Sequence, residues 1–299
     1  MTRTLVLLLL LLSVLPTRAA DKLRVVATTA DLGAIAAAVG GDAVLVTTLA
    51  RPTEDPHFVD AKPSFIRILN QADVLVEGGA ALEAGWLPPL LDGARNPRIQ
   101  SGAPGRVVAS EGITLREVPS QLDRAQGDVH PFGNPHFLLD PANARIVAAT
   151  IARALCAVDH ARCEGYEARA KAFAGTIDAK LPGWQAAPAP ARGQKVVAYH
   201  KSFDYLAAPF GLEILDTLEP KPGIPPSPTH VAELVPRMQA AGVRVILIEP
   251  YRERQTPDLV AGKTGARVVV LPIMPDKDAP DYVGFIDHDV GTIAAALEK

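Results

Sequence analysis

Short runs of β-branched residues alternate along this chain with alanine- and leucine-rich stretches of helical period. Strands that alternate with helices are typical of parallel sheets, because two parallel strands need a long connection between them. The alternation therefore predicts an α/β protein. The runs that we expect to form strands are Leu23–Thr29, Val44–Leu49, Val74–Glu77, Lys195–Tyr199, Glu213–Leu215, Val245–Glu249 and Arg267–Leu271.

The expected strands fall into two groups, which are separated by the strand-poor region Pro141–Trp184. Asp140 stands where a helix N-cap is expected, with a proline at the first helical position. A second helix is predicted from about Ala161 toward Leu181, and Pro182-Gly183 is expected to end it. We therefore predict two lobes, each a mostly parallel sheet with flanking helices, and a stiff helix that joins them.

The first twenty residues have the composition of a secretory signal peptide. Arg3 gives a positive start, Leu5–Leu12 is almost purely aliphatic, and the segment ends in the small residues Ala19 and Ala20. The apolar run is too short for a membrane span, which needs about 20 residues. Because no cysteine follows it that could take a lipid, we expect a cleaved, soluble protein in the periplasm.

These features divide the chain into four predicted segments. Residues 1–20 form the signal peptide, 21–158 an N-terminal lobe, 159–184 the connecting helix, and 185–299 a C-terminal lobe that begins with a loop over Gln185–Gly193. Loss of Arg3 and Arg18 with the signal peptide changes the formal net charge from −3 to −5. This charge disfavours nucleic acid and anionic membrane surfaces as partners.

The two cysteines of the chain are Cys156 and Cys163. An oxidising compartment permits them to pair, and their spacing suits a short loop after a helix, where Val158-Asp159-His160 interrupts the helical period. A metal site on the two thiols is the competing interpretation, but the pair lacks other ligands nearby in the sequence. We favour a local structural disulfide.

Three of the seven histidines stand in similar positions, at the end of an expected strand or in the loop after one. They are His57, His136 and His200. Ligands bind outside the carboxyl ends of the strands in open α/β sheets, so three histidines there can converge in one crevice. Three neutral imidazoles with one carboxylate or water form a tetrahedral zinc site. A proline before His57 and another before His136 help to hold the backbone in place.

Three ordered motifs surround these histidines, and a proline-rich segment follows them. The segments are Asp55-Pro56-His57-Phe58 with Lys62-Pro63-Ser64, Gly133-Asn134-Pro135-His136-Phe137-Leu138-Leu139-Asp140-Pro141, Tyr199-His200-Lys201-Ser202-Phe203-Asp204-Tyr205, and Glu219-Pro220-Lys221-Pro222-Gly223-Ile224-Pro225-Pro226-Ser227-Pro228. Together they resemble the zinc- and manganese-binding proteins of ABC importers, the cluster A-I solute-binding proteins. The resemblance covers essentially the whole mature chain, and the proline-rich segment resembles one zinc-type branch.

The resemblance implies two α/β lobes joined by a long rigid helix, with the metal in the cleft between them. It gives metal-ligand roles to His57, His136 and His200, and it implies Zn²⁺ as the transported ligand. The implied partner is an ABC permease in the inner membrane, with a periplasmic metallochaperone as a second candidate, and we expect a monomer. A rigid connector implies modest adjustment of loops and lobes on binding.

The fourth ligand is where this sequence departs from the family pattern. Many relatives place an aspartate after the last strand of the second lobe, whereas Val270–Pro275 contains no acid. Our first choice is Glu249, at the end of an expected strand, and Asp276 and water are its rivals. An equal alternative for Glu249 is an acid that orients a ligand histidine.

The remaining histidines are expected to lie outside the site. His130, six residues before His136, has an accessory ligand as its alternative role, but we expect a solvated loop histidine. We expect His160, His230 and His288 to be structural or exposed. Zinc-type relatives often carry a histidine-rich loop that gathers metal, and the corresponding stretch here, Arg116–Val129, contains no histidine.

A secreted zinc hydrolase is the main alternative from another class, since three histidines with an open position also form a catalytic site, where Glu249 would be a general base. The chain has no His-Glu-x-x-His or Gly-x-Ser-x-Gly motif, and we therefore predict a binding protein that is not an enzyme. Manganese is the alternative metal, although it prefers oxygen-rich coordination. A metal chaperone or sensor is a third interpretation that the sequence does not separate from an importer component.

Overall fold

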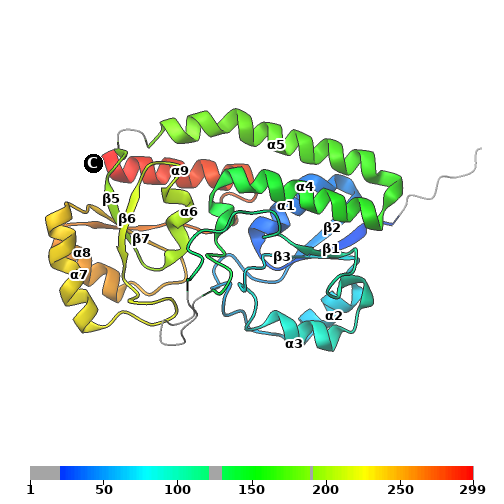
Figure 1. Ribbon diagram of the computed structural model, residues 1–299, viewed down its shortest axis with the longest axis horizontal. Helices are drawn as coiled ribbons and strands as arrows, with labels where there is room; N and C mark the ends of the chain where they lie inside the picture. Colours follow the sequence, from blue (N-terminus) through cyan, green and yellow to red (C-terminus); the bar gives the residue numbers. More distant parts are fainter. Residues whose placement is uncertain (1–20, 121–129, 189–190, 299) are drawn as a thin grey trace, which may run out of the picture.

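The structure is a computed structural model that describes residues 21–120, 130–188 and 191–298. Two α/β lobes lie side by side, and a long helix runs over both of them (Figure 1). The predicted fold class is confirmed. The predicted signal peptide lies outside the described residues, as do residues 121–129 of the histidine-free stretch Arg116–Val129.

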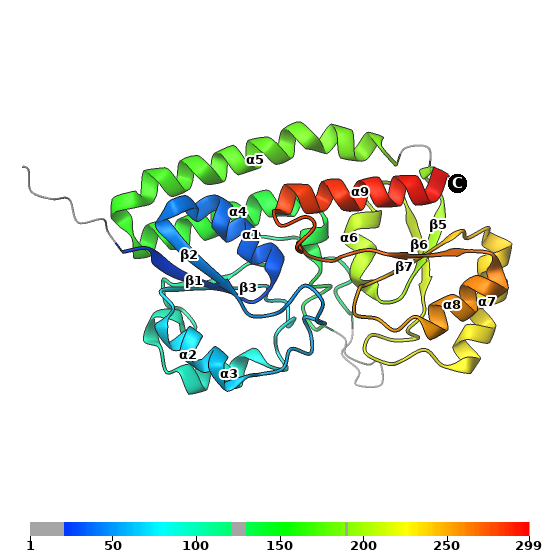
Figure 2. The ribbon, with the colours of Figure 1, turned by 180° about the vertical axis from the view of Figure 1, so that it is seen from behind.

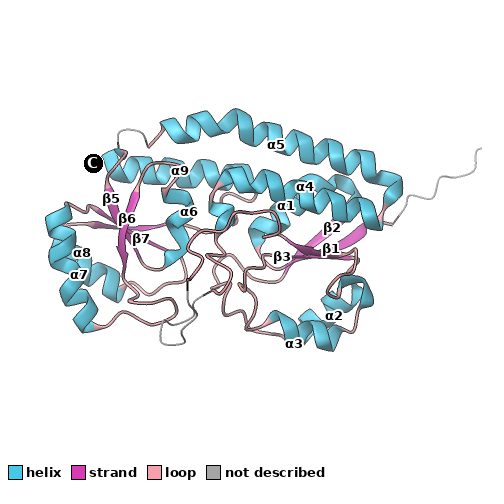
Figure 3. Ribbon diagram, in the orientation of Figure 1, coloured by secondary structure: helices cyan, strands magenta, loops and turns pink. Residues whose placement is uncertain are grey.

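The N-terminal lobe is a four-stranded parallel sheet with the strand order β2-β1-β3-β4. The strands are β1 (Leu23–Ala27), β2 (Val44–Thr48), β3 (Val74–Glu77) and β4 (Arg106–Val108). One face is covered by α1 (Ala30–Gly40) and α4 (Pro141–Val158), and the other by α2 (Pro63–Gln71) and α3 (Leu87–Ala94), as Figure 3 shows.

The C-terminal lobe repeats this topology, with the strand order β6-β5-β7-β8 and all strands parallel. Its strands are β5 (Lys195–Ala198), β6 (Glu213–Thr217), β7 (Val245–Ile248) and β8 (Arg267–Val270). The short helix α6 (Asp204–Ala207) and α9 (Tyr282–Glu298) cover one face, and α7 (Pro228–Ala241) and α8 (Gln255–Thr264) cover the other (Figure 2).

All seven predicted strands are present, and each end lies within two residues of its prediction. The structure adds β4, which the sequence did not indicate because it is only three residues long and begins with an arginine. Its one buried side chain is Val107. A strand this short offers too little alternation to stand out from a loop.

The helices between the lobes begin as predicted but end differently. The Asp140 side chain accepts a hydrogen bond from the backbone N–H of Ala142, and a proline occupies the first turn of α4. The helix α5 (Cys163–Ala186) continues through Pro182, so the prediction that it ends there is wrong. Trp184 is buried and donates a hydrogen bond to Asp287 of α9 (2.7 Å), and this packing holds the turn beyond the proline.

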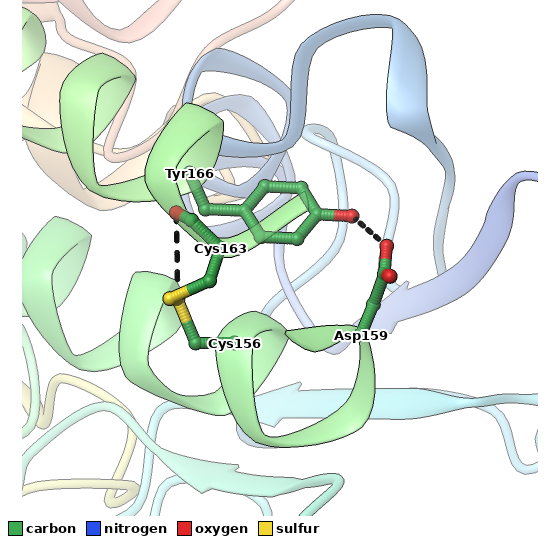
Figure 4. The surroundings of a disulfide bond; sticks show 4 residues. All are labelled: Cys156, Asp159, Cys163 and Tyr166. Carbon is green, nitrogen blue, oxygen red and sulfur yellow. Dashed lines mark hydrogen bonds between the residues drawn. A yellow bond between two sulfur atoms is a disulfide. The ribbon is translucent and has the colours of Figure 1, made fainter. Parts of the chain in front are cut away.

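The turn between α4 and α5 is closed by a disulfide bond between Cys156 and Cys163, as predicted (Figure 4). Beside it, the buried hydroxyl group of Tyr166 donates a hydrogen bond to Asp159 Oδ2 (2.7 Å). Asp159 also pairs with Arg162 in the same turn. The turn is therefore fixed both covalently and by polar contacts.

One hydrophobic core runs beneath α5 and joins the two lobes. The buried residues of α5 are spaced by three, four or seven positions, so they form one face: Tyr166, Ala170, Phe173, Ile177 and Trp184. This core contains residues of β1 and β3 from the first lobe and of β5 and β7 from the second, together with α9. Two smaller cores lie under α2 and α3 and under α7 and α8. Within the described ranges, no helix has the length and apolar character needed to cross a bilayer.

Candidate metal centre

His57, His136 and His200 come together where the two lobes meet. Each offers one ring nitrogen, and these three nitrogens all lie within 4.8 Å of one another. The centroid of the His57 ring lies 5.1 Å from that of His136 and 5.4 Å from that of His200, and the His136 and His200 centroids are 5.6 Å apart. Because the rings are steeply inclined to one another, their edges and not their faces meet.

Local contacts hold each histidine. The backbone N–H of His57 donates to Asp55 Oδ1 (3.0 Å), and that of His136 donates to Asn134 Oδ1 (3.0 Å). His200 lies two residues beyond β5. His136 differs from the expected position, because the described residues between β4 and His136 contain no strand and it is instead followed by a short 3₁₀ helix that leads into α4.

Two carboxylates decide which nitrogen of the histidines faces the centre. Nδ1 of His57 lies 2.6 Å from Asp55 Oδ1, and Nδ1 of His200 lies 2.7 Å from Glu219 Oε2. A carboxylate accepts hydrogen bonds only, so each Nδ1 donates to it, and in the neutral ring Nε2 is the nitrogen that keeps a lone pair. Nε2 of the buried His136 has no hydrogen-bond partner in the described part of the chain. The Nε2 atoms of His136 and His200 are thus available to a metal ion, and that of His57 becomes available when its contact with His130 Nε2 (3.1 Å) is broken.

The environment keeps His136 in the form that binds metal. Burial lowers the pKa of His136 well below its ordinary value, and the neighbouring His57, His200, His130 and Arg252 lower it further. A metal ion needs a neutral imidazole, because the ligand lone pair is absent from the protonated ring. His136 is therefore uncharged at neutral pH before metal arrives.

Arg252, which the sequence analysis did not single out, lies among three acids next to the histidines. Its guanidinium nitrogens are 3.1 Å from Glu219 Oε1, 3.5 Å from Asp55 Oδ2 and 3.5 Å from Glu249 Oε2. Burial alone would lower the pKa of Arg252, but these acids and Tyr251 raise it above its ordinary value. Burial likewise tends to raise the pKa of Asp55, but the hydrogen bond and charge of His57 and the charge of Arg252 lower it. The only feature of the sequence that could have indicated Arg252 is its position in the loop after the strand that Glu249 follows.

Glu249 and Asp276 do not join the converging nitrogens. Among the described residues, the group of ligand atoms within 4.8 Å of one another contains His57, His136 and His200 and neither acid. Glu249 is fully buried, and its Oε1 accepts a hydrogen bond from Ser202 Oγ (2.5 Å). Asp276 Oδ1 accepts from the backbone N–H of residues two and three positions ahead, in its own turn.

His130 is not the solvated loop histidine that we expected. Its Nε2 lies 3.1 Å from Nε2 of His57, and the two ring centroids are 5.1 Å apart. Burial and the charges of His57 and His200 lower the pKa of His130 to about 3. Since His57 Nε2 keeps its lone pair, His130 donates the hydrogen bond in this arrangement. The sequence did not indicate this position of His130, because its partner His57 is 73 positions away in the chain.

A pocket of about 230 Å³ leads to the histidines. His130, His136 and His200 form part of its wall, together with Pro220 and Pro222 from the proline-rich segment. His160 and His288 are exposed or half-exposed, and His230 Nε2 donates to the carbonyl oxygen of Thr217 (2.8 Å). Their predicted structural or exposed roles are confirmed.

The sequence and the fold both match proteins of metal uptake. A family model described as ZnuA, zinc-uptake complex component A, periplasmic, matches residues 25–296. The high-affinity zinc uptake system protein ZnuA of Brucella suis is 29% identical over 167 residues, which are 55% of this chain and 50% of that protein. The manganese ABC transporter substrate-binding lipoprotein PsaA of Streptococcus anginosus is 24% identical over 289 residues, 93% of this chain and 90% of that protein. A crystal structure of ZnuA superimposes with a TM-score of 0.77 at 23% identity, covering 92% of this chain and 99% of that one.

Proposed function

Because this chain belongs to the family of ZnuA, the periplasmic component A of zinc-uptake complexes, we propose that it captures zinc and delivers the ion to an ABC permease in the inner membrane. The proposed ligands are the Nε2 atoms of His57, His136 and His200. The observation that carries the proposal is that one ring nitrogen of each of these histidines, from two lobes, lies within 4.8 Å of the other two. Two nitrogens on one tetrahedral zinc ion lie about 3.3 Å apart, since each is about 2.0–2.1 Å from the metal. Small inward movements therefore suffice.

The kind of ligand favours zinc over manganese. Imidazole suits zinc, whereas manganese prefers carboxylate, carbonyl and water oxygens. Among the residues that the structure describes, the converging group contains three histidine nitrogens and no carboxylate oxygen. We propose zinc as the cargo, although one similar protein is named for manganese.

The surrounding charges support a divalent cation without a carboxylate ligand. The acids Asp55, Glu219 and Glu249 around the one guanidinium of Arg252 give a formal net charge of −2, which is opposite to that of Zn²⁺. Glu249 contacts Ser202 and Arg252 in the described part of the chain, so for this acid we propose an indirect role through Arg252 instead of either predicted role. The carboxylates that contact ligand histidines are Asp55 and Glu219, and such outer carboxylates raise the basicity of the ligands.

A zinc titration of metal-free residues 21–299 against a competing chelator tests the proposal. We expect one zinc ion per chain, and we expect His136→Gln to weaken binding strongly, because that variant removes a buried ligand and leaves the other two rings in place. His288→Gln is the matched control, since the His288 side chain is 49% exposed. Unchanged affinity in His136→Gln, or tighter binding of manganese than of zinc, contradicts the proposal.

Delivery to a permease needs a test in cells. In a strain whose zinc growth defect is due to loss of its own periplasmic zinc-binding protein, the wild-type chain together with its cognate permease and ATPase should restore growth in low zinc, and the His136→Gln chain should not. If both proteins restored growth equally, the role of the chain in zinc uptake would not depend on this metal site. Hydrolysis of esters or peptides that disappears in His200→Ala would instead support the alternative of a zinc hydrolase.

A further inference from the structure

The two acids that hold ligand histidines share one cation. Asp55 contacts His57 with Oδ1 and faces Arg252 with Oδ2, and Glu219 contacts His200 with Oε2 and Arg252 with Oε1. Each carboxylate therefore bridges one ligand ring and the same guanidinium group. A continuous polar chain runs from one proposed ligand through Arg252 to the other.

This polar chain crosses from one lobe to the other. Asp55 and His57 belong to the loop after β2 of the N-terminal lobe, whereas Glu219, His200 and Arg252 follow the ends of β6, β5 and β7 in the C-terminal lobe. The loops that carry the two ligands are thus linked by Arg252 without any metal ion. The links are short on the C-terminal side (3.1 Å to Glu219) and longer on the N-terminal side (3.5 Å to Asp55).

We propose that Arg252 is a positioning residue that holds the two halves of the zinc site in register before zinc binds. The inference rests on the proposed zinc-binding function. By fixing Asp55 and Glu219, Arg252 fixes the Nδ1–H groups of His57 and His200 and so directs both Nε2 atoms to one point. Removal of Arg252 leaves each acid free to turn its second oxygen elsewhere, and the ligand rings turn with it.

The surroundings of Arg252 favour an arginine in particular. Its guanidinium carbon lies 5.0 Å from the ring centroid of Tyr199 and 5.2 Å from that of Tyr251. These two aromatic rings therefore help to orient the plane of the guanidinium group. Nε faces the buried Glu249 at 3.5 Å, which leaves the two terminal nitrogens for Asp55 and Glu219. A lysine ammonium is a single point on a flexible stem and cannot reach all three acids in this geometry.

The competing explanation is that Arg252 only neutralises the acids. The two explanations predict opposite changes in zinc affinity when Arg252 is removed. If neutralisation is the whole role, loss of Arg252 makes the site more negative and zinc binds more tightly. If Arg252 positions the ligands, its loss weakens binding, as loss of outer partners of metal ligands commonly does by about 10- to 100-fold.

The test compares Arg252→Met and Arg252→Lys with the control Arg254→Met, since Arg254 is half-exposed and pairs with Asp258 in an adjacent turn. Circular dichroism first establishes that each metal-free protein is folded, and zinc affinity is then measured by chelator competition. We expect about tenfold weaker binding or more in Arg252→Met, no restoration in Arg252→Lys, and no change in the control. If Arg252→Met does not fold, the zinc affinity of Arg252→Lys alone tests the inference, because this variant keeps the positive charge and removes only the planar guanidinium group.

A double-mutant cycle shows whether Arg252 acts through the two acids. In the background Asp55→Asn with Glu219→Gln, the effect of Arg252→Met on zinc affinity should largely disappear, since the groups that transmit it are gone. The visible absorption of bound Co²⁺ should change in Arg252→Met, because the ligand geometry changes. A purely structural arginine would lower thermal stability and leave this spectrum unaltered.

Three results would overturn the inference: tighter zinc binding in Arg252→Met, full recovery in Arg252→Lys, or an equal effect of Arg252→Met in the double-variant background. Failure of the proposed function is a different outcome. In that case the wild-type protein does not bind zinc, or His136→Gln binds it normally, whatever the behaviour of Arg252.

Discussion

Replacement of Glu219 by glutamine tests how strongly the outer carboxylates support the proposed zinc ligands. Glu219 is 3% exposed, and its two oxygens serve His200 Nδ1 (2.7 Å) and Arg252 (3.1 Å). A glutamine has one oxygen that accepts hydrogen bonds and one nitrogen that donates them. The variant can therefore satisfy His200 or Arg252 but not both.

The expected cost follows from this loss of one partner. Removal of an outer partner of a metal ligand commonly weakens metal binding by about 10- to 100-fold. Glutamine keeps one of the two contacts, so we expect about 30-fold weaker zinc binding, which corresponds to about 2 kcal/mol. Glu219→Ala, which removes both contacts, should lie near about 100-fold.

The assay is competition between the metal-free protein and a fluorescent zinc chelator at neutral pH. Glu213→Gln is the matched control, because the Glu213 side chain is 58% exposed and pairs only loosely with Lys195 (3.3 Å). Its zinc affinity should equal that of the wild type, since an exposed ion pair contributes little. An equal affinity in Glu219→Gln and Glu213→Gln would refute the reasoning, since the outer carboxylate would then have no effect on the ligand.

Four further predictions concern the pocket, the turn, the pH and the shape of the protein. His130 lies outside the group of three converging nitrogens, but the 3.1 Å between its Nε2 and that of His57 is close to the spacing of two ligands on one ion. As an added ligand it predicts about tenfold weaker zinc binding and a shifted Co²⁺ spectrum in His130→Gln, and unchanged affinity and spectrum would exclude His130 from the site. Replacement of both Cys156 and Cys163 by serine should lower the free energy of unfolding by about 2.5 kcal/mol and Tm by about 5 °C, because the disulfide closes a loop of about eight residues. The zinc affinity should stay the same, and a melting curve equal to that of the wild type would contradict the prediction. The pKa of His136 is low in the folded protein and ordinary, near 6.5, in the unfolded chain, so the folded state binds fewer protons and its stability falls as pH drops below 6.5. Denaturant titrations of the metal-free proteins at pH 7.5 and 5.5 should show a smaller loss of unfolding free energy in His136→Gln than in the wild type. An equal loss in both proteins would contradict this prediction. X-ray scattering should show no large compaction when zinc is added, because one core joins the lobes, and a strong decrease in radius of gyration would contradict a rigid connection.

The fold was predictable because it depends on local patterns. Seven of the strands contain β-branched runs, and the start of α4 has an N-cap and a proline that the sequence displays directly. The end of α5 was not predictable in the same way. Pro182 is a local stop signal, and the contact that overrides it, from Trp184 to Asp287, joins positions 103 apart in the chain.

The site was predictable only in part, for a related reason. His57, His136 and His200 stand in recognisable motifs near strand and helix ends, and the topology of parallel sheets brings such ends together. His130 and Arg252 carry no motif, and their importance comes from what they contact. The Glu249 and Asp276 candidates were acids in plausible loops, but the structure directs Glu249 toward Ser202 and Arg252 and leaves Asp276 in its own turn.

The helix α5 spans about 36 Å from its 24 residues, and it rests on both lobes along a single apolar face. We expect a protein braced in this way to keep nearly the same outer shape with and without metal. A partner that distinguishes the two states would then have to contact the loops around the histidines, because the overall shape would not differ between them.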